Sequence, residues 1–211
     1  MTTLITMRAV VRRNLHDEDA TAYLWTDNEI DRHLAHAVTE FSLALPLETR
    51  ADVATVAGGR DLDITALTGR ISIAAVEFPK GYLPPRYNRF GVWLDTLTLL
   101  DEAVGTGANA AVYYGKLHTL SASASTIPAC FEELVARGAG GYAALELAVF
   151  TANRVNHGGA DTAARYLRLG TYWVKDFKAE LRRVGHRGGV RTSSFYGPAA
   201  LPVSERRVYG P

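Results

Sequence analysis

The chain has 211 residues, of which 47% are hydrophobic, and its 23 lysines and arginines nearly balance its 22 aspartates and glutamates. A chain of this size and composition can bury a core of its own, which excludes a disordered, fibrous or disulfide-stapled protein. Its one cysteine, Cys130, cannot form an internal bridge, and no charge-free run of about 18 residues is present, so we expect neither a secretion signal nor a membrane span.

The first 48 residues predict a pair of helices. Apolar residues recur at helical spacing over residues 3–15, and the W-T-D-N-E-I run that follows at residues 25–30 contains a capping box. Thr26 can accept a bond from a free amide of the first turn, and Glu29 can reach back to the capping residue. Pro46 then ends the second helix.

The hydrophobic period changes to two over residues 50–120, which predicts β-strands. Val53–Val56 and Leu62–Ile64 flank Gly58-Gly59, and this pattern predicts a hairpin. Further strands are expected at residues 71–78, 87–94, 97–100 and 111–120. Strands this apolar need a second layer, so we expect a small antiparallel sandwich or barrel.

Helical character returns after Ser125-Thr126-Ile127-Pro128, where hydroxyl caps precede a proline. The run Gly138-Ala139-Gly140-Gly141 predicts a break, followed by a helix over residues 142–155 that is apolar nearly all round. Glu146 is the exception in this helix, and we expect an ion pair for it with Arg154 or with a neighbouring chain.

The last predicted helix, residues 161–184, repeats apolar residues at alternating spacings of four and three. Such a heptad seam requires a partner helix. We therefore expect a subunit interface formed by Leu167, Val174, Phe177, Leu181 and Glu146.

Residues 185–211 have no amphipathic period and predict an extended tail. Its basic and apolar residues are typical of a segment that binds an acidic protein groove or nucleic acid, and its small net charge favours the protein groove. The expected partner-binding residues are Arg187, Arg191, Phe195, Tyr196, Leu201, Val203, Arg206, Arg207 and Tyr209.

These patterns together predict an α+β fold that is mainly α. Residues 1–48 and 121–184 form one small helical bundle, residues 50–120 form an inserted antiparallel β sandwich or barrel-like unit, and residues 185–211 form an extended C-terminal tail.

Few residues offer catalytic chemistry. His33, His36 and Glu40 share one helix face, but no further ligand is apparent, so we expect no metal and no cofactor. Two alternative functions remain open. In the first, the chain is a small hydrolase that uses Glu146 or the His33/His36/Glu40 face. In the second, it is a DNA-binding regulator that uses its basic last helix and tail.

Four short motifs resemble the head-to-tail adaptor (connector) proteins of tailed bacteriophages, and the likeness spans residues 3–196 in layout. They are the W-T-D-N-E-I box at residues 25–30, Ser125-Thr126-Ile127-Pro128 at the start of a helix, Arg154-Val155-Asn156 before a Gly-Gly break, and the basic helix Phe177–Val184.

The resemblance implies a non-enzymatic structural virion protein that forms a ring, commonly of twelve subunits. Such a ring docks on the portal protein, contacts the next tail or neck protein and continues the channel through which DNA passes without sequence-specific binding. An extended C-terminal segment often grips the portal in this family. The expected location is the head-tail junction of the virion after assembly in the host cytoplasm, with no membrane partner.

Overall fold

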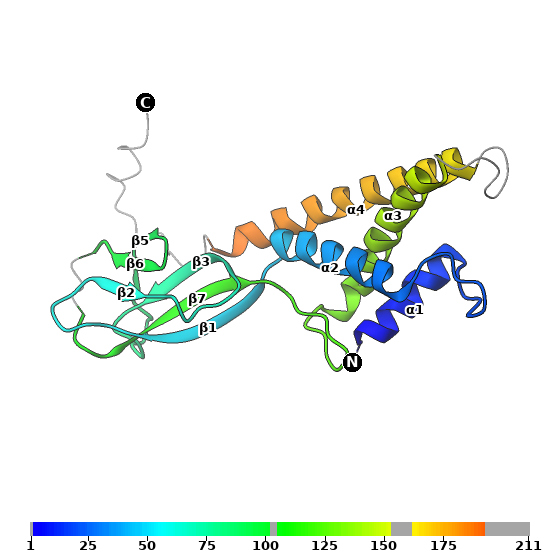
Figure 1. Cartoon of the computed structure of the whole chain (residues 1–211). Coiled ribbons are helices and arrows are strands. Elements are labelled where there is room, and N and C mark those ends of the chain that lie inside the picture. The colour runs from blue at the N-terminus through cyan, green and yellow to red at the C-terminus, as the bar shows by residue number, and fades with distance from the viewer. Residues whose placement is uncertain (1, 102–104, 153–161, 193–211) are drawn as a thin grey trace, which may run out of the picture. The chain divides into compact units, whose positions relative to one another are not determined.

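The fold is that of a computed structural model (Figure 1), which describes residues 2–101, 105–152 and 162–192, with side chains up to Gly185. The chain divides into two compact units. A helical unit contains Met1–Leu45 and His118–Gly185, and a β unit contains Pro46–Leu117. The chain has an α+β fold that is mainly α, as the sequence predicts.

The helical unit begins with α1 (Leu4–Leu15) and α2 (Asp27–Ala44). The predicted capping box of α2 is present. The amide of Glu29 donates to Thr26 Oγ1, and the amide of Thr26 donates to Glu29 Oε2 at 2.7 Å. Two free donors at the start of the helix are therefore satisfied by residues only three positions apart.

A buried guanidinium holds the loop between α1 and α2. Arg12 donates to Asp17 at 2.6 Å, to the carbonyl of Trp25 at 3.0 Å and to Asp27 at 2.7 Å, while Asp17 accepts the amide of Leu24 at 2.8 Å. Arg12 and Asp17 are both almost fully buried. A buried charge needs such complete pairing, because an unpaired one would be strongly destabilising.

The second helical pair consists of α3 (Glu132–Ala152), preceded by the 3-10 turn η1 (Ala129–Phe131), and the long helix α4 (Thr162–Thr192). The break predicted at Gly138–Gly141 is wrong, because α3 runs through these residues without interruption. The predicted tail boundary is also wrong, since the backbone of residues 186–192 continues α4.

The glycines of α3 remain helical because α4 packs directly on them. A Cβ atom at Gly138 would lie 2.8 Å from the ring of Phe177, and one at Gly141 would lie 2.9 Å from Val174. A Cβ atom at Gly170 of α4 would lie 2.8 Å from the carbonyl oxygen of Gly141. Glycine is thus required where the two helices approach closely, and the packing offsets its low helix propensity.

This close packing overturns the predicted subunit interface. Phe177 is fully buried and Leu181 almost so, both in the core of their own chain, and Val174 is half-buried against Gly141. The apolar heptad seam of α4 packs against α3 of the same chain. Of the apolar seam residues assigned to another subunit, only Leu167 is mostly exposed, at 52%.

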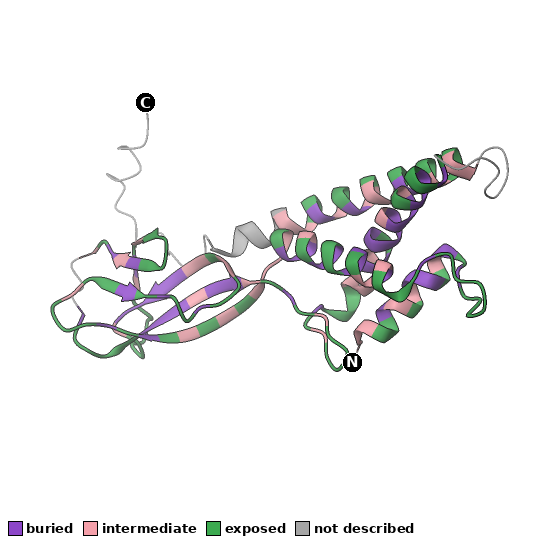
Figure 2. Ribbon diagram, viewed as in Figure 1, coloured by how far each residue is buried: buried purple, intermediate pink, exposed green. Residues whose placement is uncertain are grey.

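The helical core lies between the four helices, where the buried positions of Figure 2 face one another. Trp25 joins the loop after α1 to α3 by donating its indole N–H to the carbonyl of Ala143 at 3.2 Å. The largest fully buried side chains of this core are those of Met7, Ile30, Leu34, Phe41 and Phe177.

Most strands of the β unit lie near their predicted positions, but the first begins at Leu47, six residues earlier than expected, and the strand expected over residues 87–94 is divided into two. In the described residues they are β1 (Leu47–Ala54), β2 (Asp61–Asp63), β3 (Arg70–Glu77), β4 (Tyr87–Asn88), β5 (Phe90–Trp93), β6 (Thr96–Leu99) and β7 (Asn109–Lys116).

These strands form two antiparallel sheets, in the orders β1-β7-β3-β4 and β2-β6-β5. The hairpin predicted between Val53–Val56 and Leu62–Ile64 is wrong, because β1 pairs along its whole length with β7 and β2 pairs with β6. Both sheets supply one apolar core, which makes the unit a small sandwich. Its buried residues include Val53, Leu62, Phe78, Leu97 and Val112.

We predict that Gly170→Ala destabilises the helical unit. In an isolated helix this change stabilises by about 1 kcal/mol. Here the added methyl group would overlap the backbone of Gly141 and Leu145, so we expect a loss of about 1–3 kcal/mol in the free energy of unfolding.

Urea denaturation followed by far-ultraviolet circular dichroism measures this loss. Thr171→Ala, at the exposed neighbouring position, is the control and should change stability by less than about 0.5 kcal/mol. A stabilised Gly170→Ala protein would show that the two helices do not pack this closely.

Candidate functional site

Glu146 is paired within its own helical unit. It accepts two bonds from Arg32 Nη2, at 2.5 and 2.6 Å, and lies 2.5 Å from His33 Nε2. Both partners come from α2, so the carboxylate ties α2 to α3. The sequence correctly indicates an ion pair for Glu146, but it points to Arg154 or another chain, and Arg154 lies outside the described residues.

The other two residues of the predicted α2 face join a second polar group. Tyr142 of α3 donates to Glu40 at 2.5 Å, and its ring packs edge-on against His36. Lys178 of α4 also lies 3.5 Å from Glu40. His36 and Glu40 are 3.9 Å apart. The face singled out from the sequence therefore lies at the junction of three helices.

The electrostatics of these groups favour ion pairing over proton transfer. Burial lowers the pKa of His33 despite the nearby Glu146, which favours the neutral imidazole, and its Nε2 lies at hydrogen-bond distance from the carboxylate. Burial is the largest single influence and acts to raise the pKa of Glu146, but the hydrogen bonds and charges of Arg32 and His33 together outweigh it, so the pKa lies below its usual value. Burial and Glu40 together raise the pKa of Tyr142.

A catalytic use of His33 needs a nucleophile or a water that it can activate. Among the described contacts, its ring is hydrogen-bonded to Glu146, and no hydroxyl or thiol lies within hydrogen-bond distance of it. Cys130 is exposed in η1. The arrangement can therefore fasten helices together, and the residues of the hydrolase alternative are occupied in doing so.

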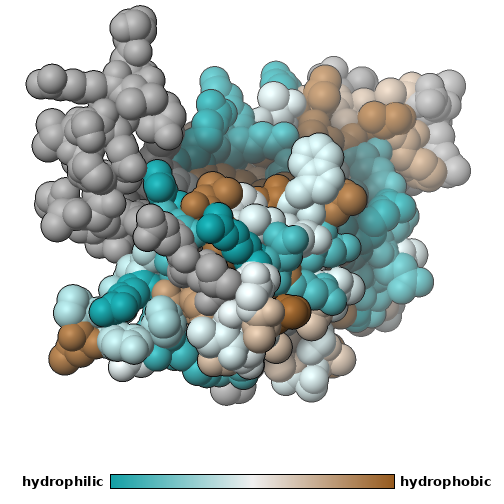
Figure 3. All heavy atoms as spheres, turned by 90° about the vertical axis from the view of Figure 1, so that its left-hand side faces the viewer, coloured by the Kyte–Doolittle hydropathy of each residue, from teal (hydrophilic) through white to brown (hydrophobic). Residues whose placement is uncertain are grey.

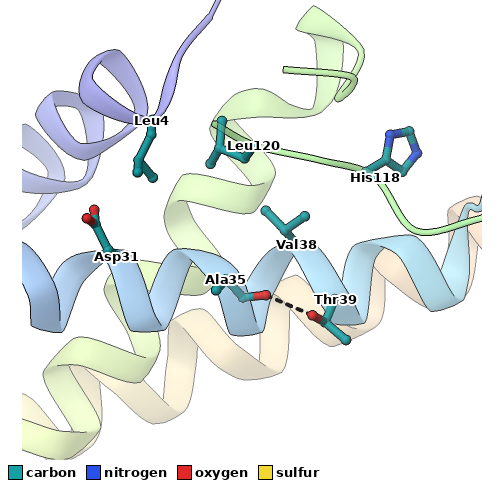
Figure 4. Close-up of a pocket in the computed structure, with 7 residues that line it drawn as sticks. All are labelled: Leu4, Asp31, Ala35, Val38, Thr39, His118 and Leu120. Atoms are coloured by element: carbon teal, nitrogen blue, oxygen red, sulfur yellow. Dashed lines mark hydrogen bonds between the residues drawn. The ribbon is translucent and has the colours of Figure 1, made fainter. Parts of the chain in front are cut away.

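A pocket of about 300 Å³ lies beside α2 (Figure 4). Its two ionisable groups already have partners. Asp31 accepts from Arg8 at 2.7 Å, and both ring nitrogens of His118 lie within 3.0 Å of the backbone carbonyls of Thr126 and Leu45. The lining residues are Leu4, Asp31, Ala35, Val38, Thr39, His118 and Leu120.

Residues 2–101, 105–152 and 162–192 contain neither a metal-ligand cluster nor a membrane-spanning helix. No group of three or more His, Cys, Asp and Glu residues there could hold a metal ion. Among the same residues, no helix combines the length and the apolar character needed to cross a bilayer.

The outward face of α4 carries the basic residues that the DNA-binding alternative invoked for the last helix. Within residues 2–45 and 118–152 and the described side chains of α4, most lysines and arginines form an ion pair with a carboxylate. They are Arg8, Arg12, Arg13, Arg32, Arg137, Lys178 and Arg183. Within the same described residues, four cations form no ion pair with a carboxylate. They are Arg165, Arg168, Lys175 and Arg182 of α4, which we call the cationic stripe.

Each unit also exposes large apolar side chains. In the helical unit, Val149 at the end of α3 and Leu167 near the start of α4 are 67% and 52% exposed. In the β unit, Leu83 is 96% exposed, and Trp93 and Leu94 are each 81% exposed. Figure 3 shows hydrophobic surface among hydrophilic side chains on the face turned toward the viewer.

The turn that carries Trp93 and Leu94 joins β5 to β6 and is held in a fixed shape. Leu94 adopts a φ of 51°, a left-handed conformation that is unfavourable for a residue with a branched side chain. Arg70 stabilises it by donating to the Leu94 carbonyl at 2.8 Å and to Asp95 at 2.5 Å. The exposed apolar tip is therefore presented by a turn whose strain the fold supports.

The predicted tail residues fall on the least described part of the chain. Arg187 and Arg191 lie on the backbone of α4, where side chains are not described, and Phe195, Tyr196, Leu201, Val203, Arg206, Arg207 and Tyr209 lie outside the described residues.

Comparison with protein-family models and with curated proteins found no family model and no curated protein that matches this chain.

We predict that Glu146→Gln destabilises the helical unit in a pH-dependent way. Because the pKa of Glu146 in the folded protein lies below its unfolded value of about 4.3, the ionised carboxylate stabilises the fold above that pH. This stabilisation disappears as the pH falls through the folded-state pKa. The difference in unfolding free energy between the two proteins should therefore be largest near pH 7 and shrink below about pH 4.

Urea titrations from pH 7 to pH 3 measure this difference. Glu132→Gln is a suitable control, because Glu132 has no cationic partner among the described side chains, and it should leave stability nearly unchanged throughout. A Glu146→Gln penalty that stayed constant with pH would contradict the assignment.

Proposed function

We propose that this chain is a non-enzymatic structural virion protein, a ring-forming head-to-tail adaptor of a tailed bacteriophage. In this proposal the ring contains twelve subunits, docks on the portal protein and contacts the next tail or neck protein. It continues the DNA channel and joins the capsid to the tail. Its location is the head-tail junction, after assembly in the host cytoplasm.

The observation that carries the proposal is the exposure of large apolar side chains on both units. Adjacent exposed apolar side chains such as Trp93 and Leu94 are candidate contact surfaces, because each costs free energy in contact with water. Val149 and Leu167 in the helical unit, and Trp93 and Leu94 in the β unit, are suited to burial by other subunits or virion proteins. A closed ring would cover such surfaces on every copy.

The shape of the β5–β6 turn supports the same proposal. Arg70 holds the Leu94 backbone in an unfavourable conformation, so the backbone that carries the Trp93 and Leu94 side chains is set before any partner arrives. A preorganised apolar tip loses little conformational entropy on docking, which favours its use as a contact with a protein partner.

We expect the purified chain to form multimers whose mass approaches twelve subunits as concentration rises. Val149→Ser/Leu167→Ser and, separately, Trp93→Ser should shift the population toward single chains, because they remove apolar area from the proposed contacts. Light scattering coupled to size-exclusion chromatography gives these masses.

Val56→Ser provides the matched control. Val56 is also exposed, in the segment between β1 and β2, and replacing it should leave the mass distribution unchanged. A wild-type chain that stays single both alone and with the portal protein of the same virus would overturn the proposal.

We expect residues 193–211 to bind the portal protein. They follow α4 and combine apolar with basic residues, namely Phe195, Tyr196, Leu201, Val203, Tyr209, Arg206 and Arg207. Deleting these residues leaves every described element intact, so circular dichroism should be unchanged. We expect binding to the portal protein, followed by co-sedimentation, to be lost, because the deleted residues would supply the groove contacts.

A deletion that starts before residue 193 would also shorten α4, which includes residues 186–192, so a loss of portal binding could come from the helix as well as from the tail. Portal binding that survived removal of residues 193–211 would assign the docking contacts to the folded units instead.

A further inference from the structure

The cationic stripe follows a single face of α4. Its members stand at spacings of three, seven and seven residues, which is the repeat of one helix face. At 1.5 Å per residue the stripe is roughly 26 Å long. Tyr172 occupies the same face between Arg168 and Lys175 and is also exposed.

This face is turned away from the packing of the bundle. Gly170, Val174, Phe177 and Leu181 point to α3 and the core, whereas the stripe residues are exposed to solvent. Because Phe177 is anchored against Gly138, α4 cannot rotate to bury the stripe without losing its close contact with α3.

The carboxylates of the helical unit cannot readily neutralise the stripe, even from a second copy. Most of them are already bonded to cations of their own chain, as Asp17, Asp27, Asp31, Glu146 and Asp176 are. Those without a cation in the described residues are Asp19, Glu29, Glu132 and Glu133, of which Glu29 caps α2 and Glu133 accepts a bond from Asn14. These acids come from separate elements and do not repeat along one helix face as the cations do.

We propose that the cationic stripe of α4 contacts the phosphate backbone of double-stranded DNA without reading its sequence. A duplex carries one negative charge for about every 1.7 Å of its axis, so a linear row of cations meets phosphates along its whole length. Lysine and arginine supply charge, and the Tyr172 hydroxyl supplies a further donor of a kind that commonly bonds phosphate. The stripe lacks the asparagine and glutamine side chains that often read base edges.

This inference rests on the ion-pair arrangement of the helical unit and does not require a ring. It names the surface that would face DNA if the chain lines a channel. It can be tested on the full chain whatever its mass in solution, so its failure and the failure of the proposed function are separate results.

The experiment measures the salt dependence of binding to two fluorescent 30-base-pair duplexes of unrelated sequence, by anisotropy between 50 and 200 mM KCl. Four phosphate contacts predict a slope of about −3.6 in a plot of log K against log salt, which is a loss of affinity of roughly 150-fold over this range. The two duplexes should bind within about threefold of each other, because backbone contacts carry no sequence information.

Arg168→Ala/Lys175→Ala tests the stripe directly. Removing two contacts should reduce the slope to about −1.8, so that affinity falls only roughly 12-fold over the same salt range. Arg13→Ala/Arg60→Ala is the matched control, since it removes the same net charge from exposed positions outside α4 and should leave the slope at the wild-type value.

Circular dichroism and the urea midpoint should be unchanged in both variants, because no contact of the four replaced side chains contributes to a core. The proposal is overturned if the wild type does not bind either duplex, if the stripe variant keeps the wild-type slope, or if the control lowers the slope equally. It is also overturned if the stripe variant dissolves multimers while its slope is unchanged, which would assign the stripe to a contact between copies.

Discussion

The close approach of α3 and α4 is the constraint on which the helical unit depends. At the crossing, the backbone of Gly141 faces Gly170 without intervening side chains, and Phe177 fits against Gly138. This contact uses the apolar seam of α4 inside the chain and directs the opposite face to solvent. The same geometry therefore decides which residues form the core and which remain available to partners.

Charge is distributed in two ways in this unit. Where helices meet, arginines and lysines are matched to carboxylates, as Arg32 is to Glu146 and Lys178 is to Glu40. On the outside of α4 the cations have no such match among the described residues. Paired charges in the first group hold α2, α3 and α4 together, whereas the second group costs little in water and is free to meet a ligand.

Local signals in the sequence predicted local structure well. Thr26 and Glu29 lie three residues apart and determine the start of α2 by themselves, and the period of two located the strands. Tertiary choices were not predictable in this way. The glycines of α3 predict a break because Phe177, whose packing keeps this segment helical, lies far along the chain. The alternation of apolar residues shows which face of β1 is buried, but not that β7 is its neighbour.

The candidate site shows the same limit. A heptad seam indicates that a helix partner exists but not which chain provides it, so Phe177 and Leu181 were assigned to a subunit contact that α3 replaces. The residues that pair with Glu146 and Glu40 come from other helices and have no signature near either acid. The basic character of the last helix was visible in the sequence, but the tertiary structure decides which of its cations have a carboxylate partner.

The buried Arg12 links the bundle to its most polar loop. Because its guanidinium bonds Asp17, Asp27 and the Trp25 carbonyl, this loop cannot detach while α1 and α2 keep their positions. The amide of Leu24 should exchange its hydrogen with solvent more slowly than the amides of loop residues that lack such a bond. Although residues 18–24 are exposed, the segment is thereby tied to the helical core through the buried Asp17 and Trp25.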